Sequence, residues 1–454
     1  MSQPGREQVL SQCPGSGGRV LSARHRRGEV PLPAGFVRLL LSWFAVQSAD
    51  GMRFAALPLL AYFTDRSPVA VAGVAAATSL PWLLIALPAG LIVDRLDPAT
   101  VMAWANLARA VAAIAVAGAI WADLVSIVLL GAIGFGLTAA ETFTDSAAQS
   151  LLVQMVPTEQ LERANARFVS SENIGFDLIG PLSAGALFTL AKWAPFLVSA
   201  LAFAVAATVI ITLGGARCTP GPGSGRPGVA VDTADIPSVD GSGRPGRQQA
   251  RTSIGGAFAA VFSDPVLRPL VITVAVLAAT VAAVEGVLVI YATGPLGLPS
   301  ALFPTLLASY SVGLLGSAPL LPRVVGRFGS GKVMLSVICV AAITLMMLGA
   351  FPQRELAWAC FLVMGAAFGF WNILSATRRQ RRTPRGTTAA VSSAFRTIAW
   401  GAVPLGAALG GAGAQRWGVA RVFFVAGVVV LMLAVVMGRQ LLRPAAAVEV
   451  GLQS

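Results

Sequence analysis

The 454-residue chain is strongly apolar: 56% of its residues are hydrophobic, 12% are charged, and its mean hydropathy is +0.76. Because soluble domains carry about 25% charged residues, this composition excludes a soluble enzyme and a coiled coil and indicates a membrane protein. The formal net charge of +13 comes almost entirely from arginine, since Lys192 and Lys332 are the only lysines, and we attribute it to membrane topology instead of nucleic-acid binding.

Hydropathy windows of about 19 residues predict twelve transmembrane helices along the chain. Each is long enough for a bilayer, which requires ~20 apolar residues per helix. The expected fold is therefore an all-α membrane protein. The predicted spans are 36–62, 68–93, 99–121, 124–152, 163–190, 193–214, 266–292, 301–323, 332–351, 355–377, 386–412 and 418–438.

A polar segment separates the sixth predicted span from the seventh. It contains the hexapeptide GSGRPG twice, at 223–228 and 241–246, and this composition is typical of a flexible linker. We therefore expect two six-helix bundles joined by a tether. The expected division is a tail over 1–35, a first bundle over 36–214, the linker over 215–264, a second bundle over 265–441 and a tail over 442–454.

The basic residues predict the orientation of the chain. With the N-terminus inside, the cytoplasmic segments hold 24 of the 33 Lys and Arg residues and the outside segments hold 5. Basic residues accumulate in cytoplasmic loops because they resist translocation. The distribution predicts a multi-pass plasma-membrane protein with both termini in the cytoplasm.

Matching motifs indicate that the two halves are repeats. The loop after the second span contains Gly90, Asp94 and Arg95, and the loop after the eighth contains Arg327. Each loop places its arginine seven residues before a methionine. At a cytoplasmic helix end, Asp94 and Arg95 can pair with charges or helix termini of the opposite bundle when an inner gate is closed. Alternatively, they are a solvated pair in a loop.

A looser correspondence joins the fifth span to the eleventh. The fifth contains Gly180 and Pro181, and the eleventh contains Pro404 and Gly406. Glycine and proline in a membrane helix leave a smooth groove and a kink, although small residues also pack helices in any membrane protein.

Three stretches, at 56–76, 80–95 and 140–152, together with these Gly/Pro helices, resemble the major facilitator superfamily. Within it they are most similar to the group around the enterobactin exporter, the transmembrane secretion effectors. The resemblance covers almost all of 36–440. It implies two pseudo-symmetric six-helix bundles that rock around a central cavity, with substrate bound near the midplane, and it associates the fifth helix with export.

The chain departs from the family pattern in two places. The GxxxDR signature, carried by Gly90, Asp94 and Arg95, continues with Asp97-Pro98-Ala99-Thr100 instead of further basic residues, so we expect a weaker electrostatic latch. The Arg-x-x-Gln-Gly motif of many proton-coupled drug exporters is absent from the fourth span. The resemblance therefore does not itself imply proton coupling.

Ionisable residues inside the spans are the candidates for transport chemistry, because each is costly in a bilayer. At 1.5 Å per residue, Asp50 lies about 21 Å and Glu141 about 24 Å from the cytoplasmic helix ends, so the two carboxylates are expected at similar depth. Arg53, one turn after Asp50, could neutralise either. Arg109, about 16 Å deep, is a second possible partner.

Glu141 and Asp145 are four residues apart and share a helix face, where two ionised carboxylates repel. Unless a cation bridges them, one is expected to hold a proton, as a coupling site requires. The alternatives are a buried ion-pair network that fixes helix register, or contact with substrate. Further candidates, each of which could instead be a gate or packing contact, are Glu172, Asp177 and Glu285.

Trp371 and Asn372 in the tenth span could offer a ligand an aromatic wall and a hydrogen bond, or could join helices.

No cofactor or metal site is expected, since His25 is the only histidine and lies in the polar tail. The segment from Gly326 to Lys332 fits GxxxxGK but lacks the following Ser/Thr and the preceding strand of a nucleotide-binding loop. The basic cluster from Arg378 to Arg385 is interpreted as an anchor to anionic lipid.

The function expected is that of a proton-driven secondary exporter of a small amphipathic organic molecule, such as a siderophore or an antibiotic. The alternatives are an uptake symporter or facilitator of the same fold, a membrane-embedded enzyme, or a transporter-like receptor. The expected partners are the substrate, protons and the lipid bilayer, with the protein acting as a monomer and binding no nucleic acid.

Overall fold

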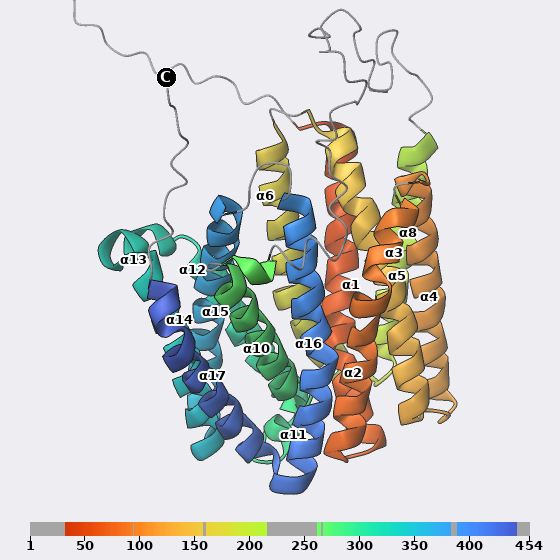
Figure 1. Ribbon diagram of the computed structural model, residues 1–454. Helices are drawn as coiled ribbons and strands as arrows, with labels where there is room; N and C mark the ends of the chain where they lie inside the picture. Colours follow the sequence, from red (N-terminus) through yellow and green to blue (C-terminus); the bar gives the residue numbers. More distant parts are fainter. Residues whose placement is uncertain are drawn as a thin grey trace, which may run out of the picture.

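The computed structural model describes residues 32–93, 95–157, 160–215, 261–264, 267–382 and 388–442. Within these ranges the chain is helical and contains no strand. Figure 1 shows the helices running roughly side by side in two groups. The all-α fold predicted from the composition is confirmed.

The first half of the chain forms six membrane crossings. Several helices begin at proline or at a capping side chain: the Asp97 carboxylate accepts from the Thr100 amide at 2.9 Å, and the Ser126 hydroxyl accepts from the Leu129 amide at 3.2 Å, which satisfies amides that a helix start leaves free. The elements are α1 (Ala34–Thr64), α2 (Pro68–Leu84) with α3 (Ala86–Val93), α4 (Pro98–Trp121), α5 (Ile127–Met155), α6 (Leu161–Glu172) with η2 (Asn173–Ile179) and α7 (Gly180–Leu190), and α8 (Ala194–Gly215).

The second half forms six further crossings in the same order. They are α10 (Leu267–Glu285) with α11 (Leu288–Thr293), η3 (Ser300–Leu302) with α12 (Phe303–Ser317), α14 (Ser330–Ala350), α15 (Arg354–Arg382), α16 (Thr388–Trp417) and α17 (Val419–Leu442). A short helix, α13 (Leu321–Phe328), lies between α12 and α14.

Ten of the described helices are long and apolar enough to cross a membrane. The other two crossings are α1, which contains Asp50 and Arg53, and the α2–α3 pair, which is interrupted at Ile85. One expected boundary is wrong: the span predicted over 301–323 ends at Ser317, and the chain then turns and forms α13 as a separate helix.

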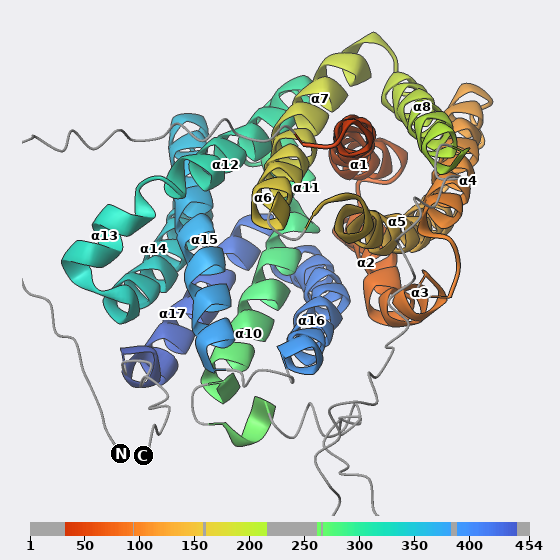
Figure 2. The ribbon, with the colours of Figure 1, turned by 90° about the horizontal axis from the view of Figure 1, so that it is seen from above.

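Close backbone contacts relate the two halves by the same helix pairing. In the first half, a Cβ on Gly180 would lie 2.5 Å from the Cα of Gly51 on α1. In the second half, a Cβ on Gly406 of α16 would collide with the backbone of Ala279 on α10. The fifth crossing thus packs on the first as the eleventh packs on the seventh, and Figure 2 shows the two bundles side by side.

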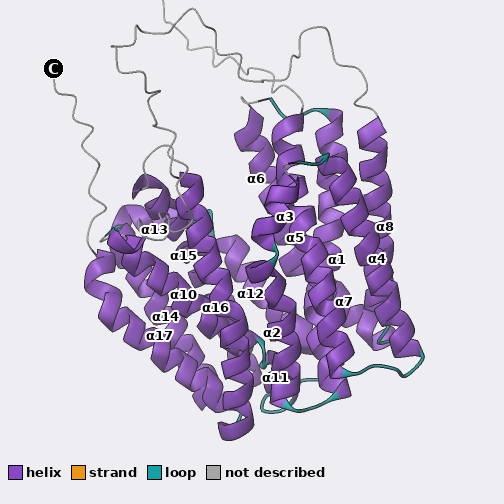
Figure 3. Ribbon diagram, turned by 45° about the vertical axis from the view of Figure 1, so that its right-hand side comes forward, coloured by secondary structure: helices purple, strands orange, loops and turns teal. Residues whose placement is uncertain are grey.

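The bundles touch mainly along two pairs of elements, α2 with α16 and the η2–α7 segment with η3 and α12, and α1 makes a smaller contact with α11. Along the first pair, the Trp82 and Trp400 rings stack at 4.9 Å and the Ser67 hydroxyl lies 3.4 Å from the Gln415 side-chain oxygen. We call the end where α8 ends and α10 begins the linker end, and the opposite one the far end. The bundles converge at the far end and diverge toward the linker end (Figures 1 and 3).

Candidate functional site

A network of charged side chains lies inside the first bundle, between α1, α4 and α5. Arg53 of α1 places Nη2 2.5 Å from the Oε2 of Glu141 on α5, and its Nη1 donates to the Thr138 hydroxyl at 3.1 Å. Its Nε lies 3.6 Å from the Oδ1 of Asp50, one turn earlier on α1. Arg53 and Glu141 are each 8% exposed, so these ion pairs are almost closed to solvent.

Arg109 of α4 completes the network from the other side of Asp50. Its Nη2 forms an ion pair with the Asp50 Oδ1, and its Nη1 donates to the Asn106 side-chain oxygen at 3.4 Å. The guanidinium carbon lies 4.1 Å from the centroid of the Phe203 ring on α8. Asp50, Asn106 and Arg109 are all 0% exposed. A bidentate donor such as Arg suits this position because it stays charged and can bond several oxygens.

The network contains more carboxylates than guanidinium groups. Asp145, one turn along α5, lies close enough to Glu141 and Asp50 for their charges to interact. With Asp145 the cluster has three carboxylates, against the guanidinium groups of Arg53 and Arg109. The Oδ1 of Asp145 and the Oδ2 of Asp50 are both buried without a hydrogen-bond partner. A buried, uncompensated carboxylate is costly, so this site favours binding one more positive charge.

A second acidic cluster lies where the two bundles meet. Asp177 belongs to η2 of the first bundle and Glu285 to the end of α10 in the second, and their charges are close enough to interact. Tyr310 of α12 lies near both, and Glu172 lies near Asp177. Within the described residues, none of the three acids forms an ion pair with Arg or Lys. Glu285 is exposed, and it lies about 27 Å along α10 from the linker end.

One hydrogen bond joins the bundles next to this cluster. The hydroxyl of Ser311 on α12 donates to the backbone carbonyl of Asp177 at 2.5 Å, and it also lies 2.8 Å from the Leu307 carbonyl of its own helix. Asp177 belongs to η2, a π-helical segment, and π-helical turns occur frequently at functional sites. The contact between the halves is therefore made at the irregular part of this crossing.

The loop residues proposed for a cytoplasmic gate lie at the linker end. Gly90 is in α3, Arg95 is exposed just after it, and Arg327 is exposed at the end of α13 in the other bundle. Asp94 lies outside the described residues. Within the described part of the chain neither arginine forms an ion pair, and the Arg327 guanidinium lies 5.5 Å from the centroid of the adjacent Phe328 ring.

The remaining sequence candidates are divided between packing and exposed positions. Gly180, Pro181, Pro404 and Gly406 are all buried. Gly180 and Gly406 permit the close helix contacts described above. Trp371 is 3% exposed within the core of the second bundle, whereas Asn372 is exposed. The structure therefore does not bring this neighbouring pair together as one polar and aromatic wall.

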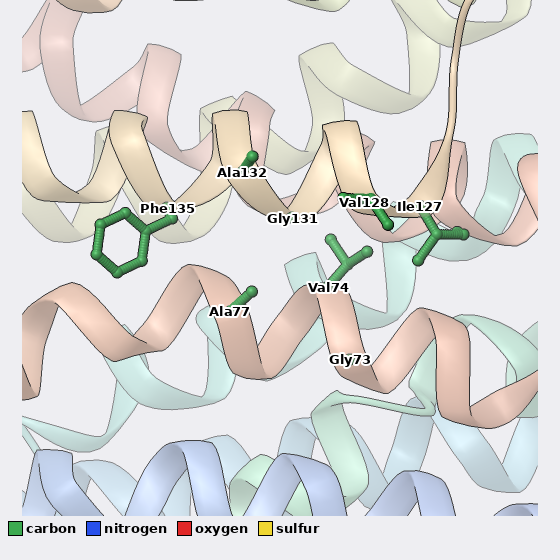
Figure 4. A pocket seen from close by; sticks show the side chains of 8 residues that line it. All are labelled: Gly73, Val74, Ala77, Ile127, Val128, Gly131, Ala132 and Phe135. Carbon is green, nitrogen blue, oxygen red and sulfur yellow. The ribbon is translucent and has the colours of Figure 1, made fainter.

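The described residues also form an apolar pocket between α2 and α5 (Figure 4), with a volume of about 440 Å³. Its lining has no ionisable side chain and includes Val74, Ile127 and Phe135. None of its lining residues belongs to the charge network, although Phe135 lies six residues before Glu141 on α5. No group of three or more His, Cys, Asp or Glu side chains in the described chain could hold a metal ion.

Several residues of these sites were not among the sequence candidates. Asn106 and Thr138 each lie three residues before a candidate, Arg109 and Glu141, and that spacing places them on the same helix face. This signal could have identified both. Tyr310 and Ser311 have no such local signal, since their partners are on the other bundle.

The chain matches the family model of the Major Facilitator Superfamily over residues 39–404. No curated protein matches it in sequence. Its fold is similar to that of the nucleoside transporter NupG, with 14% identity, 91% of this chain and 100% of that chain covered, and a TM-score of 0.69. A bacterial homologue of the iron transporter ferroportin in an inward-facing state has 18% identity, 90% and 99% coverage and a TM-score of 0.68.

A bacterial homologue of the human lysosomal transporter Spinster, inward-facing and unoccupied, has 14% identity, 90% and 97% coverage and a TM-score of 0.65. The family match covers most of the chain, and the paired six-helix bundles agree with it. The chain therefore belongs to the Major Facilitator Superfamily and is a membrane transporter, not an enzyme.

Proposed function

We propose that this transporter exports a small amphipathic organic molecule from the cell in exchange for protons, by alternating access. The observation that carries the proposal is the buried network in which the carboxylates of Asp50, Glu141 and Asp145 face only two guanidinium groups. Intramembrane acids with this environment are typical of proton relays.

The charge count explains why a proton suits the network. With all three carboxylates ionised, the five groups of the network have a net charge of −1 in a nearly dry interior, and Glu172 adds negative charge close to Glu141 and Asp145. One proton, on Asp145 or Glu141, makes the five groups neutral without adding an ion that needs its own ligands. Asp50 and Asp145 each have a buried oxygen without a hydrogen-bond partner. Because Asp50 is paired with Arg53 and Arg109, and Glu141 with Arg53, Asp145 is the carboxylate best placed to receive the proton.

The substrate would bind where the bundles meet. Glu285 and Asp177 offer negative charge from opposite bundles, and Tyr310 adds an aromatic ring whose centroid lies 6.1 Å from that of Phe368. Carboxylates beside aromatic rings favour a molecule with a basic group and an apolar body. The positive-inside distribution supports a cytoplasmic linker end, so the open side of this conformation would receive substrate from the cytoplasm. The gate would close when Arg95 finds a partner across the opening, whereas α13, which carries Arg327, lies on the outer side of the second bundle, away from the first.

The test uses inside-out vesicles that contain the full-length chain. Ethidium is the first probe because it is an amphipathic cation, and related cations are then screened. We expect an inwardly acidic gradient to drive accumulation inside the vesicles and a protonophore to abolish it. Accumulation that survives the protonophore would contradict proton coupling.

An uptake symporter or a facilitator of the same fold is the alternative, because the same network could serve either direction. The direction of the proton gradient that drives accumulation separates them. An exporter of the proposed kind concentrates probe in inside-out vesicles only when they are acidic inside, whereas a facilitator only equilibrates it and a symporter requires the opposite gradient.

A further inference from the structure

The short helix α13 is unlike every neighbouring element of the second bundle. It follows α12 after a turn at residues 318–320 and precedes α14. In Figures 1 and 2 it lies at the linker end, on the outer side of the second bundle and away from the first. With its eight residues, α13 is too short to cross a bilayer, so it lies where α12 and α14 leave the membrane.

The two faces of α13 differ in polarity. Leu321 is buried, and Val324 and Val325 pack against the core of the second bundle. On the other face, Arg323 and Arg327 are one turn apart and both exposed. Because the apolar face packs against the protein, the basic face is the one that α13 presents to an external partner.

Apolar side chains border this basic face at each end of the helix. Leu320 is 50% exposed and Phe328 is 56% exposed. Side chains of this kind insert between lipid headgroups when basic residues lie beside them. A purely aqueous partner would leave both exposed to water.

The charge around α13 is of one sign. Lys332, in the first turn of α14, is also exposed, and the whole segment from residue 286 to residue 354 contains no Asp or Glu. Arg323, Arg327 and Lys332 therefore form an exposed basic group that lacks an acidic residue in its own segment. Each basic residue near an anionic membrane surface strengthens attachment to it.

We propose that α13, with Arg323, Arg327, Lys332 and the flanking Leu320 and Phe328, is a docking surface for the headgroups of anionic phospholipids. The exposed apolar residues select a lipid surface over a soluble polyanion, and the three basic side chains select an anionic headgroup over a zwitterionic one. The surface is separate from the charge network and from the acidic cluster, so it does not depend on the proposed direction or coupling of transport.

The experiment counts lipids that stay bound to the purified full-length chain in native mass spectrometry while phosphatidylglycerol is titrated against phosphatidylcholine. The test variant is Arg323→Gln/Arg327→Gln/Lys332→Gln. Its control, Arg66→Gln/Arg416→Gln/Arg421→Gln, removes three exposed arginines at the far end. We expect the preference for phosphatidylglycerol to fall at least tenfold in the test variant and less than twofold in the control.

The single variant Arg323→Gln is a second test that changes only one surface residue. We expect its preference for phosphatidylglycerol to fall about fivefold. Millimolar inorganic phosphate should leave lipid retention unchanged. A test variant that keeps the wild-type preference would overturn the proposal. So would an equal loss in the control, which would indicate a general effect of charge, or displacement of the lipid by inorganic phosphate, which would indicate a site for a free anion.

Discussion

Asp50 and Arg109 form the least accessible ion pair of the charge network, since both side chains are 0% exposed. Removing one member leaves the other buried without its opposite charge, which costs about 3–5 kcal/mol for a buried pair. The alternative role for this network, fixing the register of the helices, therefore makes a clear prediction about stability.

We expect Arg109→Met to lower the free energy of unfolding by about 3 kcal/mol or more, and Asp50→Asn/Arg109→Met to recover part of that loss. Thermal unfolding of the purified variants in detergent measures both. Arg95→Gln, at an exposed position, is the control and should change stability by less than about 0.5 kcal/mol. Additive effects of the two network substitutions would show that the pair is not energetically coupled.

Ser311 makes a prediction about conformation at the same scale. Its hydroxyl bonds the Asp177 carbonyl of the other bundle, and one such bond contributes about 1 kcal/mol. We expect Ser311→Ala to shift the ratio of conformations about fivefold away from the one described here. Distances between spin labels placed on the two bundles report this ratio. Ser309→Ala is the matched control, since its hydroxyl bonds Leu306 of its own helix, and a shift of the same size there would contradict the assignment.

Part of this network could be predicted from the sequence. Helix rise alone placed Asp50 and Glu141 at similar depth, and Arg53 lies between them in the structure. Which carboxylate each arginine pairs with could not be predicted, because that depends on the rotation of α4 and α5 about their axes. The contacts of Asp177 with α10 and α12 also could not be predicted, since they join residues more than a hundred positions apart.

Gly180 is the clearest packing constraint among the elements. A Cβ there would lie 2.5 Å from the Cα of Gly51 and 2.7 Å from the Met52 amide nitrogen, and backbone atoms cannot yield as a flexible side chain can. We expect Gly180→Ala to cost about 1–3 kcal/mol of stability, measured by thermal unfolding. Gly118→Ala in α4, where a Cβ meets nothing within 4 Å, should be neutral or stabilising by up to about 1 kcal/mol. Equal effects of the two substitutions would contradict this account of the α1–α7 contact.

Hydropathy predicted the crossings because lipid requires long apolar helices with their own hydrogen bonds. It did not separate α13 from α12, since a window of about 19 residues averages over a turn. Pro319 and Pro322 were the available signal, because proline ends or begins helices, and Pro322 lies in the first turn of α13. The π-helix η2 had no comparable signal in the sequence, although its Gly175 packs closely against α1.

The distribution of the basic residues predicts the orientation of the whole molecule in the membrane. Alkaline phosphatase fused after Arg95, Ser242 or Arg382 should be inactive, because those positions are expected in the cytoplasm, and fusions after Arg66 or Arg354 should be active. Measuring phosphatase activity in whole cells, normalised to expression, tests all five positions. Activity at Ser242 would overturn the orientation and with it the direction proposed for the open side.

In the proposed mechanism, the excess carboxylate of the buried network carries the coupled proton. Its most direct test is probe-induced proton flux, measured with a pH-sensitive dye enclosed in vesicles that contain wild type, Glu141→Gln, Asp145→Asn or the control Glu355→Gln at an exposed helix start. We expect at least one of the two network variants to lose proton flux but still exchange probe for probe, since exchange moves no net proton, while Glu355→Gln behaves as wild type. Wild-type proton flux in both Glu141→Gln and Asp145→Asn would contradict the account.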